Sequence, residues 1–177
     1  MIIEIIVLSI LGIKLFNGSY SNLLKYSYED IKGKSFFIIG FLLFSLTNME
    51  FMFPYYIQLS ILTFLFLIIG FLLNYKNFGF ILIASGFILN LLPVLFNGKM
   101  PVDYNALIET GNQRKIYYIT NGYSLSHGIF AEPKLRFLTD IIPLRSPYYN
   151  PKVISLGDIF INAGIIIAII IISRRKK

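Results

Sequence analysis

Long apolar runs separated by short polar segments dominate this chain of 177 residues. Three of the runs, at about residues 35–53, 56–74 and 78–96, are each long enough as helices to cross the ~30 Å hydrocarbon core of a bilayer. A further run begins at Leu156 and ends at Ser173. The pattern predicts an all-α transmembrane fold.

The first run covers residues 1–16 and is interrupted by Glu4 and Lys14. A signal peptide carries its positive charge before the apolar run, whereas here the acidic residue comes first. We therefore expect a retained helix, which either spans the membrane or, because it is short, lies in the interface. The chain is then a single polytopic membrane domain over residues 1–177, with about five membrane-spanning helices and four as the alternative.

The segment at residues 97–157 has a different pattern, because charged residues appear and no long apolar run remains. Two stretches, residues 115–120 and 123–127, flank Asn121-Gly122, and Asn-Gly is the strongest short signal for a tight hairpin turn. We expect this segment to form a cap on the membrane face that contains a small β-hairpin. Met100-Pro101, between Asn97 and Asp103, is expected to form a rigid turn.

Small and polar residues interrupt the run at 78–96. Gly79 and Gly86 would allow another helix to approach closely, and Asn90 could form a hydrogen bond between helices. We interpret all three as residues that serve helix packing.

Charge supports the membrane interpretation. The chain is 56% hydrophobic, above the roughly 45–50% of soluble domains, and carries a net charge of +7. The basic residues lie in the short connections and in the tail at 174–177, so membrane topology explains them without a nucleic-acid partner. The positive-inside rule places this tail in the cytoplasm and residues 97–157 on the extracytoplasmic side of the cell membrane. Nothing in the pattern indicates an oligomeric state.

The residue inventory excludes several kinds of chemistry. The chain has no cysteine and one histidine, so it has no disulfide, no thiolate nucleophile and little with which to bind zinc. We expect no metal and no cofactor.

Asp140 and Asp158 are the candidate catalytic residues. A carboxylate at a membrane boundary is costly unless it is solvated, paired or used in chemistry. Two carboxylates in a poorly solvated site share one proton, so one can activate water while the other polarises a peptide carbonyl. The prolines between them would let a bent loop bring the two together.

A structural interpretation competes with the catalytic one. Asp158 follows Ser155 and Gly157 at the start of the last helix, where a carboxylate can cap free backbone N–H groups. Asp140 could instead pair with Arg136 or Arg145.

Polar residues near the two aspartates could bind a ligand. Arg136, Arg145, Lys134 and Lys152 could hold a lipid phosphate or a peptide carboxylate. His127 could carry a proton or could be an ordinary surface residue. The candidate ligand-binding residues are Asn97, His127, Arg136, Arg145 and Ser155.

Three motifs in the carboxy-terminal half resemble an uncharacterised family of small bacterial membrane proteins. They are NGKMPV at 97–102, LRFLTD at 135–140 and SLGD at 155–158, and the family has NG-x-MPV and S-I/L-GD signatures. This resemblance is why Asn97 is included among the site residues.

A fainter resemblance is to signal peptidase II, the lipoprotein signal peptidase. It is carried by LTDI at 138–141, by SLGD at 155–158 and by Gly164, six residues after Asp158. The resemblance implies a membrane aspartyl peptidase in which Asp140 and Asp158 form the catalytic pair.

Three functions follow from these observations. The first is a small integral membrane protein whose polar site at the membrane boundary binds a lipid headgroup or a membrane partner. The alternative is an intramembrane aspartyl peptidase that cleaves a membrane-anchored or lipidated peptide. A transporter is third, because the predicted helix cores hold almost no ionisable residues. Glu4, Lys14 and Glu50 all lie near predicted helix ends.

Overall fold

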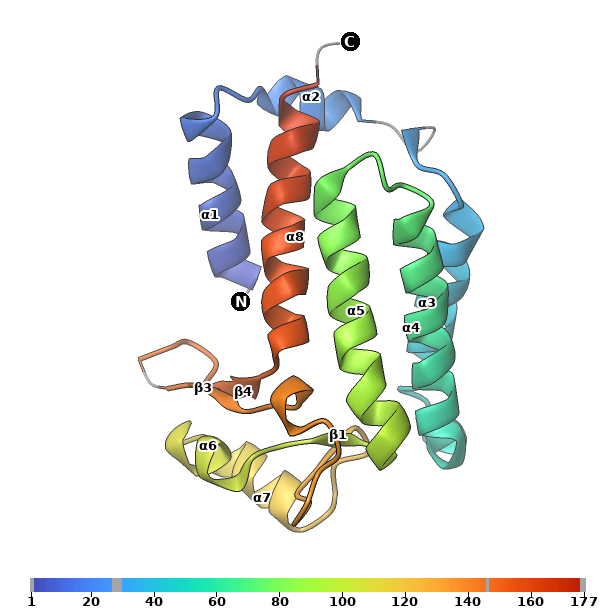
Figure 1. The fold of residues 1–177 in the computed structure, drawn as a ribbon, viewed down its shortest axis with the longest axis vertical. Helices are drawn as coiled ribbons and strands as arrows, with labels where there is room; N and C mark the ends of the chain where they lie inside the picture. The colour runs from blue at the N-terminus through green and yellow to red at the C-terminus, as the bar shows by residue number, and fades with distance from the viewer. Residues whose placement is uncertain (1, 27–29, 146, 176–177) are drawn as a thin grey trace.

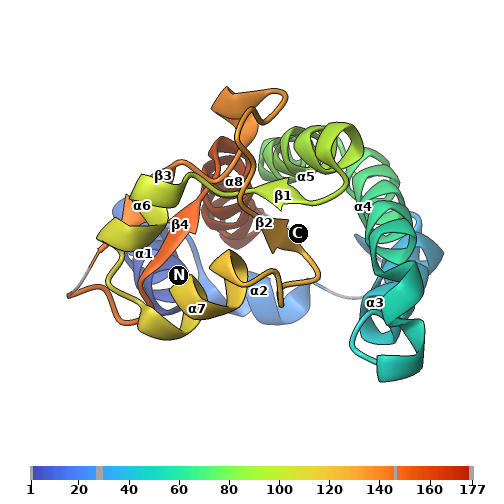
Figure 2. The same cartoon turned by 90° about the horizontal axis from the view of Figure 1, so that it is seen from below.

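Five helices form one curved row in the computed structural model, which describes residues 2–26, 30–145 and 147–175 (Figure 1). Each helix packs mainly against its neighbours in the order α1, α8, α5, α4 and α3. Seen along the helix axes, the row is curved and α7 lies beneath its concave side (Figure 2). The helices of the row are α1 (Ile2–Leu15), α3 (Lys34–Leu46), α4 (Tyr56–Leu72), α5 (Phe78–Asn97) and α8 (Leu156–Ser173).

Within the described residues, three helical segments are long and apolar enough to cross a membrane. They are Glu50–Leu72, in which the 3₁₀ helix η2 (Glu50–Tyr55) leads into α4, and the whole of α5 and α8. Helix α3 has 13 residues and α1 has 14, so each is only about 20 Å long at ~1.5 Å per residue. The predicted transmembrane class therefore stands on three candidate spans, and the count of about five is not confirmed.

The outer surface of the row is apolar. Phe41, Leu42 and Phe44 of α3 are all more than half exposed. Contiguous apolar surface of this kind would be a liability in water and is what a lipid-facing helix presents.

A short helix, α2 (Tyr20–Lys25), is joined to the end of α8 through a hydrogen bond from Asn22 Nδ2 to the Ser173 carbonyl (2.8 Å).

Close contact between α5 and α8 forms the centre of the row. A Cβ atom on Gly86 would lie 2.6 Å from the Gly157 carbonyl oxygen, and one on Gly164 would lie 2.7 Å from the Gly79 carbonyl oxygen. The two backbones touch at these points, which confirms the prediction that Gly79 and Gly86 allow close helix packing.

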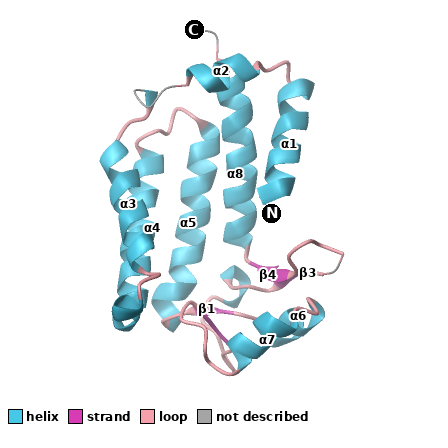
Figure 3. Cartoon of the chain, turned by 180° about the vertical axis from the view of Figure 1, so that it is seen from behind, coloured by secondary structure: helices cyan, strands magenta, loops and turns pink. Residues whose placement is uncertain are grey.

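The described residues between α5 and α8 fold into a cap with a small core of its own (Figure 3). Val102, Ala106, Leu107 and Val153 are buried together, and Ile116 and Ile119 pack against them. The elements of the cap are β1 (Met100–Pro101), α6 (Tyr104–Glu109), α7 (Gln113–Thr120), β2 (His127–Gly128), η3 (Arg136–Leu138), β3 (Ile142–Leu144) and β4 (Lys152–Ile154).

The prediction of a β-hairpin around Asn121-Gly122 is wrong about the position of the hairpin. Residues 113–120 form helix α7, whose N-cap Asn112 accepts a hydrogen bond from the backbone of Lys115 (3.2 Å). Ile116 and Ile119 are three residues apart, so a helix places both against the cap core, whereas a strand would place them on opposite faces. A small antiparallel pair does exist in the cap, between β3 and β4.

Candidate functional site

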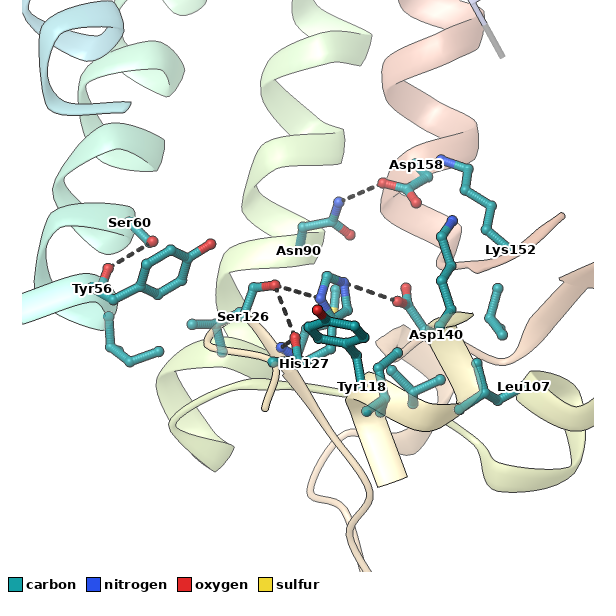
Figure 4. Close-up of a pocket in the computed structure, with 18 of the residues that line it drawn as sticks. Tyr56, Ser60, Asn90, Leu107, Tyr118, Ser126, His127, Asp140, Lys152 and Asp158 are labelled. Atoms are coloured by element: carbon teal, nitrogen blue, oxygen red, sulfur yellow. Dashed lines mark hydrogen bonds and ion pairs between the residues drawn. The ribbon is translucent and has the colours of Figure 1, made fainter. Parts of the chain in front are cut away.

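A cavity of about 440 Å³ lies between the cap and the ends of α4, α5 and α8 (Figure 4). Its size is in the range of small-molecule sites. On one side α4 and α5 contribute the apolar Ile57, Phe64 and Val94 together with Tyr56 and Ser60. On the opposite side the cap contributes apolar side chains, such as those of Val102 and Leu107, and most of the polar groups. The polar groups of the cap are Lys115, Tyr118, Ser124, Ser126, His127, Asp140 and Lys152, joined by Asn90 and Asp158 from the helix ends.

Strand β1 positions the polar centre of the cavity. On one edge, the backbone N–H groups of Met100 and Val102 donate to the carbonyls of Ser126 and Gly128, both at 2.9 Å. On the other edge, the backbone N–H of Asp140 donates to the Pro101 carbonyl (3.0 Å). Proline has no backbone N–H, so Pro101 leaves no donor unpaired in the strand. The Met100-Pro101 stretch, predicted to be a turn, is instead a strand with Asp140 on one side and His127 on the other.

Three side chains form a chain across this strand, joined by one hydrogen bond and one longer charged contact. Ser126 Oγ lies 2.6 Å from His127 Nδ1. His127 Nε2 lies 3.4 Å from Asp140 Oδ2. The carboxyl of Asp140 is almost wholly buried, whereas the His127 ring is 39% exposed toward the cavity. A hydroxyl, an imidazole and a carboxyl are therefore connected, with the hydroxyl at one end.

Burial sets the protonation of this chain. It raises the pKa of Asp140 to about 8, and the nearby Asp158 carboxylate acts in the same direction. Burial also lowers the pKa of His127 to about 4, against the opposing effect of Asp158. Between these two values the histidine–aspartate pair holds one proton and carries no net charge.

Asp158 belongs to a second network at the start of α8. Its carboxylate accepts a hydrogen bond from Asn90 Nδ2 (3.0 Å). Asn90 Oδ1 in turn accepts from Ser155 Oγ (2.7 Å), and Ser155 Oγ accepts from the backbone N–H of Asp158 (3.0 Å). Ser155 is thus the N-cap of α8, and the Asp158 carboxylate remains directed at the cavity.

Two lysines give the cavity its positive charge. Lys152 and Lys115 both line it, and Lys115 Nζ lies 3.4 Å from the Asn150 side chain and the Pro151 carbonyl. Burial lowers the pKa of Lys115, and the charge of Lys152 adds to this effect. An anion in the cavity would oppose both effects, because a nearby opposite charge favours the charged form of the ammonium groups.

The candidate catalytic residues of the sequence, Asp140 and Asp158, line the same cavity. Among the described residues, none of the hydrogen bonds joins one carboxyl to the other, since Asp140 contacts His127 and Asp158 contacts Asn90. Their roles in catalysis stay predictions. Ser155 caps α8 behind the cavity, whereas His127 lies inside it.

The remaining candidate ligand-binding residues lie away from the cavity. The predicted pairing of Asp140 with an arginine is wrong, because Arg136 binds Asp103 (3.0 Å) and Arg145 binds Glu109. Asp103 and Glu109 belong to the more exposed ends of α6, where an arginine stays solvated. The amide of Asn97 binds the backbone N–H and carbonyl of Lys134 at 2.9 and 3.0 Å, and so ties the end of α5 to the cap.

Sequence reasoning missed Ser126 and Lys115 as site residues and assigned Asn90 to packing alone. Ser126 had a usable signal, because it is the hydroxyl next to the single histidine of the chain. Lys115 had none, since its position depends on α7. In the parts of the chain that the structure describes, no group of three or more histidine, aspartate or glutamate side chains is placed to hold a metal ion.

Fold and site together define a mostly helical protein with three helices that could cross a membrane and a cap that covers a polar cavity at their ends. The chain belongs to the family described as Family of unknown function (DUF5317), which it matches over residues 31–170. It is 31% identical to an uncharacterized protein of Thermotoga maritima over 169 residues, which cover 94% of this chain and 89% of the relative. No solved structure matches the chain. The match to an uncharacterised family agrees with the resemblance stated from the sequence.

Proposed function

We propose that this is an integral membrane protein that binds the polar end of an anionic amphiphile, such as an acidic lipid headgroup, in the cavity beneath its cap. One observation carries the proposal. The cavity joins apolar side chains of α4 and α5, which belong to helical segments long enough to span a membrane, to charged groups that come mostly from the cap. An amphiphile presents this combination of surfaces, with its chain toward the helices and its headgroup toward the cap.

The net charge of the groups that line the cavity favours an anionic ligand. Two ammonium groups, Lys115 and Lys152, line the cavity, whereas the Asp140–His127 pair is neutral near pH 7 and Asp158 is one carboxylate. One positive charge is therefore left over. Lysine is a common point-charge partner of phosphate groups in proteins and at membrane surfaces.

The positive-inside rule would place the cap outside the cytoplasm of a cell membrane and the basic tail inside. The amphiphile would then enter from the outer leaflet. Addition of a glycosylation acceptor or a small reactive tag to the exposed residue Glu132 would test this orientation in intact cells.

Exchange of both cavity lysines for glutamine, as Lys115→Gln with Lys152→Gln, is expected to weaken binding of phosphatidylglycerol by about 10- to 30-fold. Each lysine near an anionic headgroup contributes about 1 kcal/mol. Native mass spectrometry of the detergent-purified full chain, titrated with phosphatidylglycerol or phosphatidylcholine, measures both affinities.

The matched control is Lys134→Gln, which removes an exposed cap lysine outside the cavity and should leave binding unchanged. Equal affinity for the two lipids in the wild type would overturn the proposal. So would equal losses in the control and the double variant.

A second candidate function is an intramembrane aspartyl peptidase that cleaves a membrane-anchored or lipidated peptide. It is favoured by the position of the two aspartates, which line the same cavity. Burial raises the pKa of Asp140 to about 8, so Asp140 would be the acid and Asp158 the base. Mass spectrometry of lipidated precursor peptides incubated with the protein tests it. We expect cleavage by the wild type and losses of ~100-fold or more in both Asp140→Asn and Asp158→Asn. Cleavage that survives Asp158→Asn would exclude the aspartyl mechanism.

A further inference from the structure

We propose that Ser126, His127 and Asp140 form a hydrolytic relay, and that the cavity cleaves a carboxylic ester of the amphiphile that it binds. Ser126 Oγ is the nucleophile and His127 the general base. The inference rests on the proposed function, because the cavity must first hold the polar end of the substrate beside Ser126.

The relay has the connectivity that activates a serine. One tautomer of His127 donates its Nε2–H toward Asp140 Oδ2 (3.4 Å) and accepts the Ser126 O–H at Nδ1 (2.6 Å). A nucleophile, a base and a carboxyl that orients the base recur in this order on unrelated folds and are recognised by geometry. Here the serine uses Nδ1 and the carboxyl uses Nε2, because serine and histidine are consecutive residues and Nδ1 is the nearer ring nitrogen.

Backbone and side-chain contacts hold the relay in place. Strand β1 binds the backbone of Ser126 on one edge and that of Asp140 on the other. Ser124 Oγ accepts the backbone N–H of His127 (3.1 Å) and lies 3.5 Å from Ser126 Oγ. Lys99 Nζ donates to the Ser124 carbonyl (2.7 Å). The nucleophile therefore needs little rearrangement to react.

The chemistry balances with water as the only co-substrate. Ser126 Oγ attacks the ester carbonyl carbon and its proton passes to His127 Nδ1. The tetrahedral intermediate collapses, the C–O bond to the alcohol breaks, and His127 returns the proton to the leaving oxygen. Water then attacks the acyl-serine, gives one proton to His127, and Ser126 recovers it as the free acid departs.

The cavity indicates the substrate class. Lys115 and Lys152 on the cap side would hold an anionic group, and Ile57 and Phe64 on the opposite wall would hold an acyl chain. Ser126 lines the same space. The ester that joins an acyl chain to an acidic headgroup would lie between these two regions, so an acyl ester of an anionic lipid is the expected substrate.

The protonation state of Asp140 makes the hydrolytic activity depend on pH. The charged groups around the relay are Asp158 from α8, Lys152 from β4 and Lys115 from α7. While Asp140 keeps its proton, it donates to His127 Nε2, and His127 then offers Ser126 an N–H instead of a lone pair. Activity should rise as the pH passes about 8, where Asp140 ionises.

The first test is covalent labelling of the full-length protein in detergent with a fluorophosphonate. Attack by Ser126 on phosphorus expels fluoride and leaves a stable adduct that intact-mass and peptide mass spectrometry locate. We expect one adduct on Ser126. Ser126→Ala and His127→Gln should each lower the labelling rate by about 10³-fold. Thr120→Ala, which removes an exposed hydroxyl of α7 outside the cavity, should keep the rate within a few-fold.

The second test is release of fatty acid from phosphatidylglycerol in mixed micelles, measured by mass spectrometry from pH 6 to 9. The wild type should release acid faster above pH 8, Ser126→Ala should not, and Asp140→Asn should lose the pH step. Asp158→Asn should move the pH step to a lower pH, because the Asp158 carboxylate helps to raise the pKa of Asp140, whereas the aspartyl mechanism would lose the reaction altogether.

Failure of this inference is distinguishable from failure of the proposed function. An adduct on any residue other than Ser126, no adduct at all, or equal labelling in Ser126→Ala would overturn the relay. The lipid affinities of the wild type and of the double lysine variant would still decide the binding proposal, because Ser126→Ala leaves both lysines in place.

Discussion

Gly164→Ala is expected to lower the free energy of unfolding by about 2 kcal/mol, although alanine is the better helix former by roughly 1 kcal/mol. The added Cβ would lie 2.7 Å from the Gly79 carbonyl oxygen and 2.8 Å from the Ile83 backbone nitrogen. Both atoms belong to the backbone of α5, so the clash can be relieved only if α5 and α8 move apart. Denaturant titration in detergent, followed by circular dichroism, measures the loss.

Gly12→Ala is the matched control, since Gly12 faces α8 from its other neighbour, α1. There the new Cβ would meet the end of the Ile170 side chain, at 2.5 Å from Cδ1. A rotamer change moves that atom, so we expect a change within about 1 kcal/mol. Similar losses in the two variants would contradict the backbone contact between α5 and α8.

The second large effect is a fall in stability of about 2 kcal/mol as the pH rises from about 6.5 to 8. Unfolding returns Asp140 and His127 to their ordinary pKa values of 3.8 and 6.5, from about 8 and about 4 in the folded protein. The raised Asp140 pKa favours folding at low pH, and that stability is lost between 3.8 and 8. The lowered His127 pKa favours folding above 6.5, and that stability is lost as the pH falls toward 4.

These two effects cancel between pH 4 and 6.5, because the folded and the unfolded chain then each hold one proton on the pair. Above 6.5 only the folded chain keeps a proton, so stability falls by about 1.4 kcal/mol per pH unit until Asp140 ionises. Melting temperatures from pH 4 to 9 in detergent measure the profile.

The variant His127→Gln should change the shape of this pH profile of stability. Without histidine nothing offsets Asp140, so stability should fall from pH 4 onward. Asp140→Asn should instead remove the fall above pH 6.5. A wild-type profile that is level from 6.5 to 8 would show that the folded protein does not retain the Asp140 proton.

The helices could be predicted from the sequence because each one is specified locally. An apolar run of 20 residues such as α5 has few alternatives in or beside a bilayer, and Gly98, in the left-handed conformation at φ 79°, ends it. Gly79 and Gly86 also indicated close packing. The number of spans was less predictable, because α1 and α3 are near the minimum length.

The cap was predicted less well because its short elements depend on distant partners. Residues 115–120 alternate well enough for a strand, but the core formed by Val102, Leu107 and Val153 binds their helical face. The cost of a carboxylate at a membrane boundary directed attention to Asp140 and Asp158, which both line the cavity. Their partners could not be derived, since Asn90 is 68 residues from Asp158 in sequence and His127 reaches Asp140 only across β1.

The place of α8 in the row determines when the protein can become complete during synthesis. Helix α8 leaves the ribosome after α1 and α5, yet it lies between them. Helix α1 therefore waits for its main partner until α8 has been made, and the glycine-lined face of α5 stays uncovered for the same period. Asp158 reaches the cavity only with α8, so a chain released early carries no assembled site.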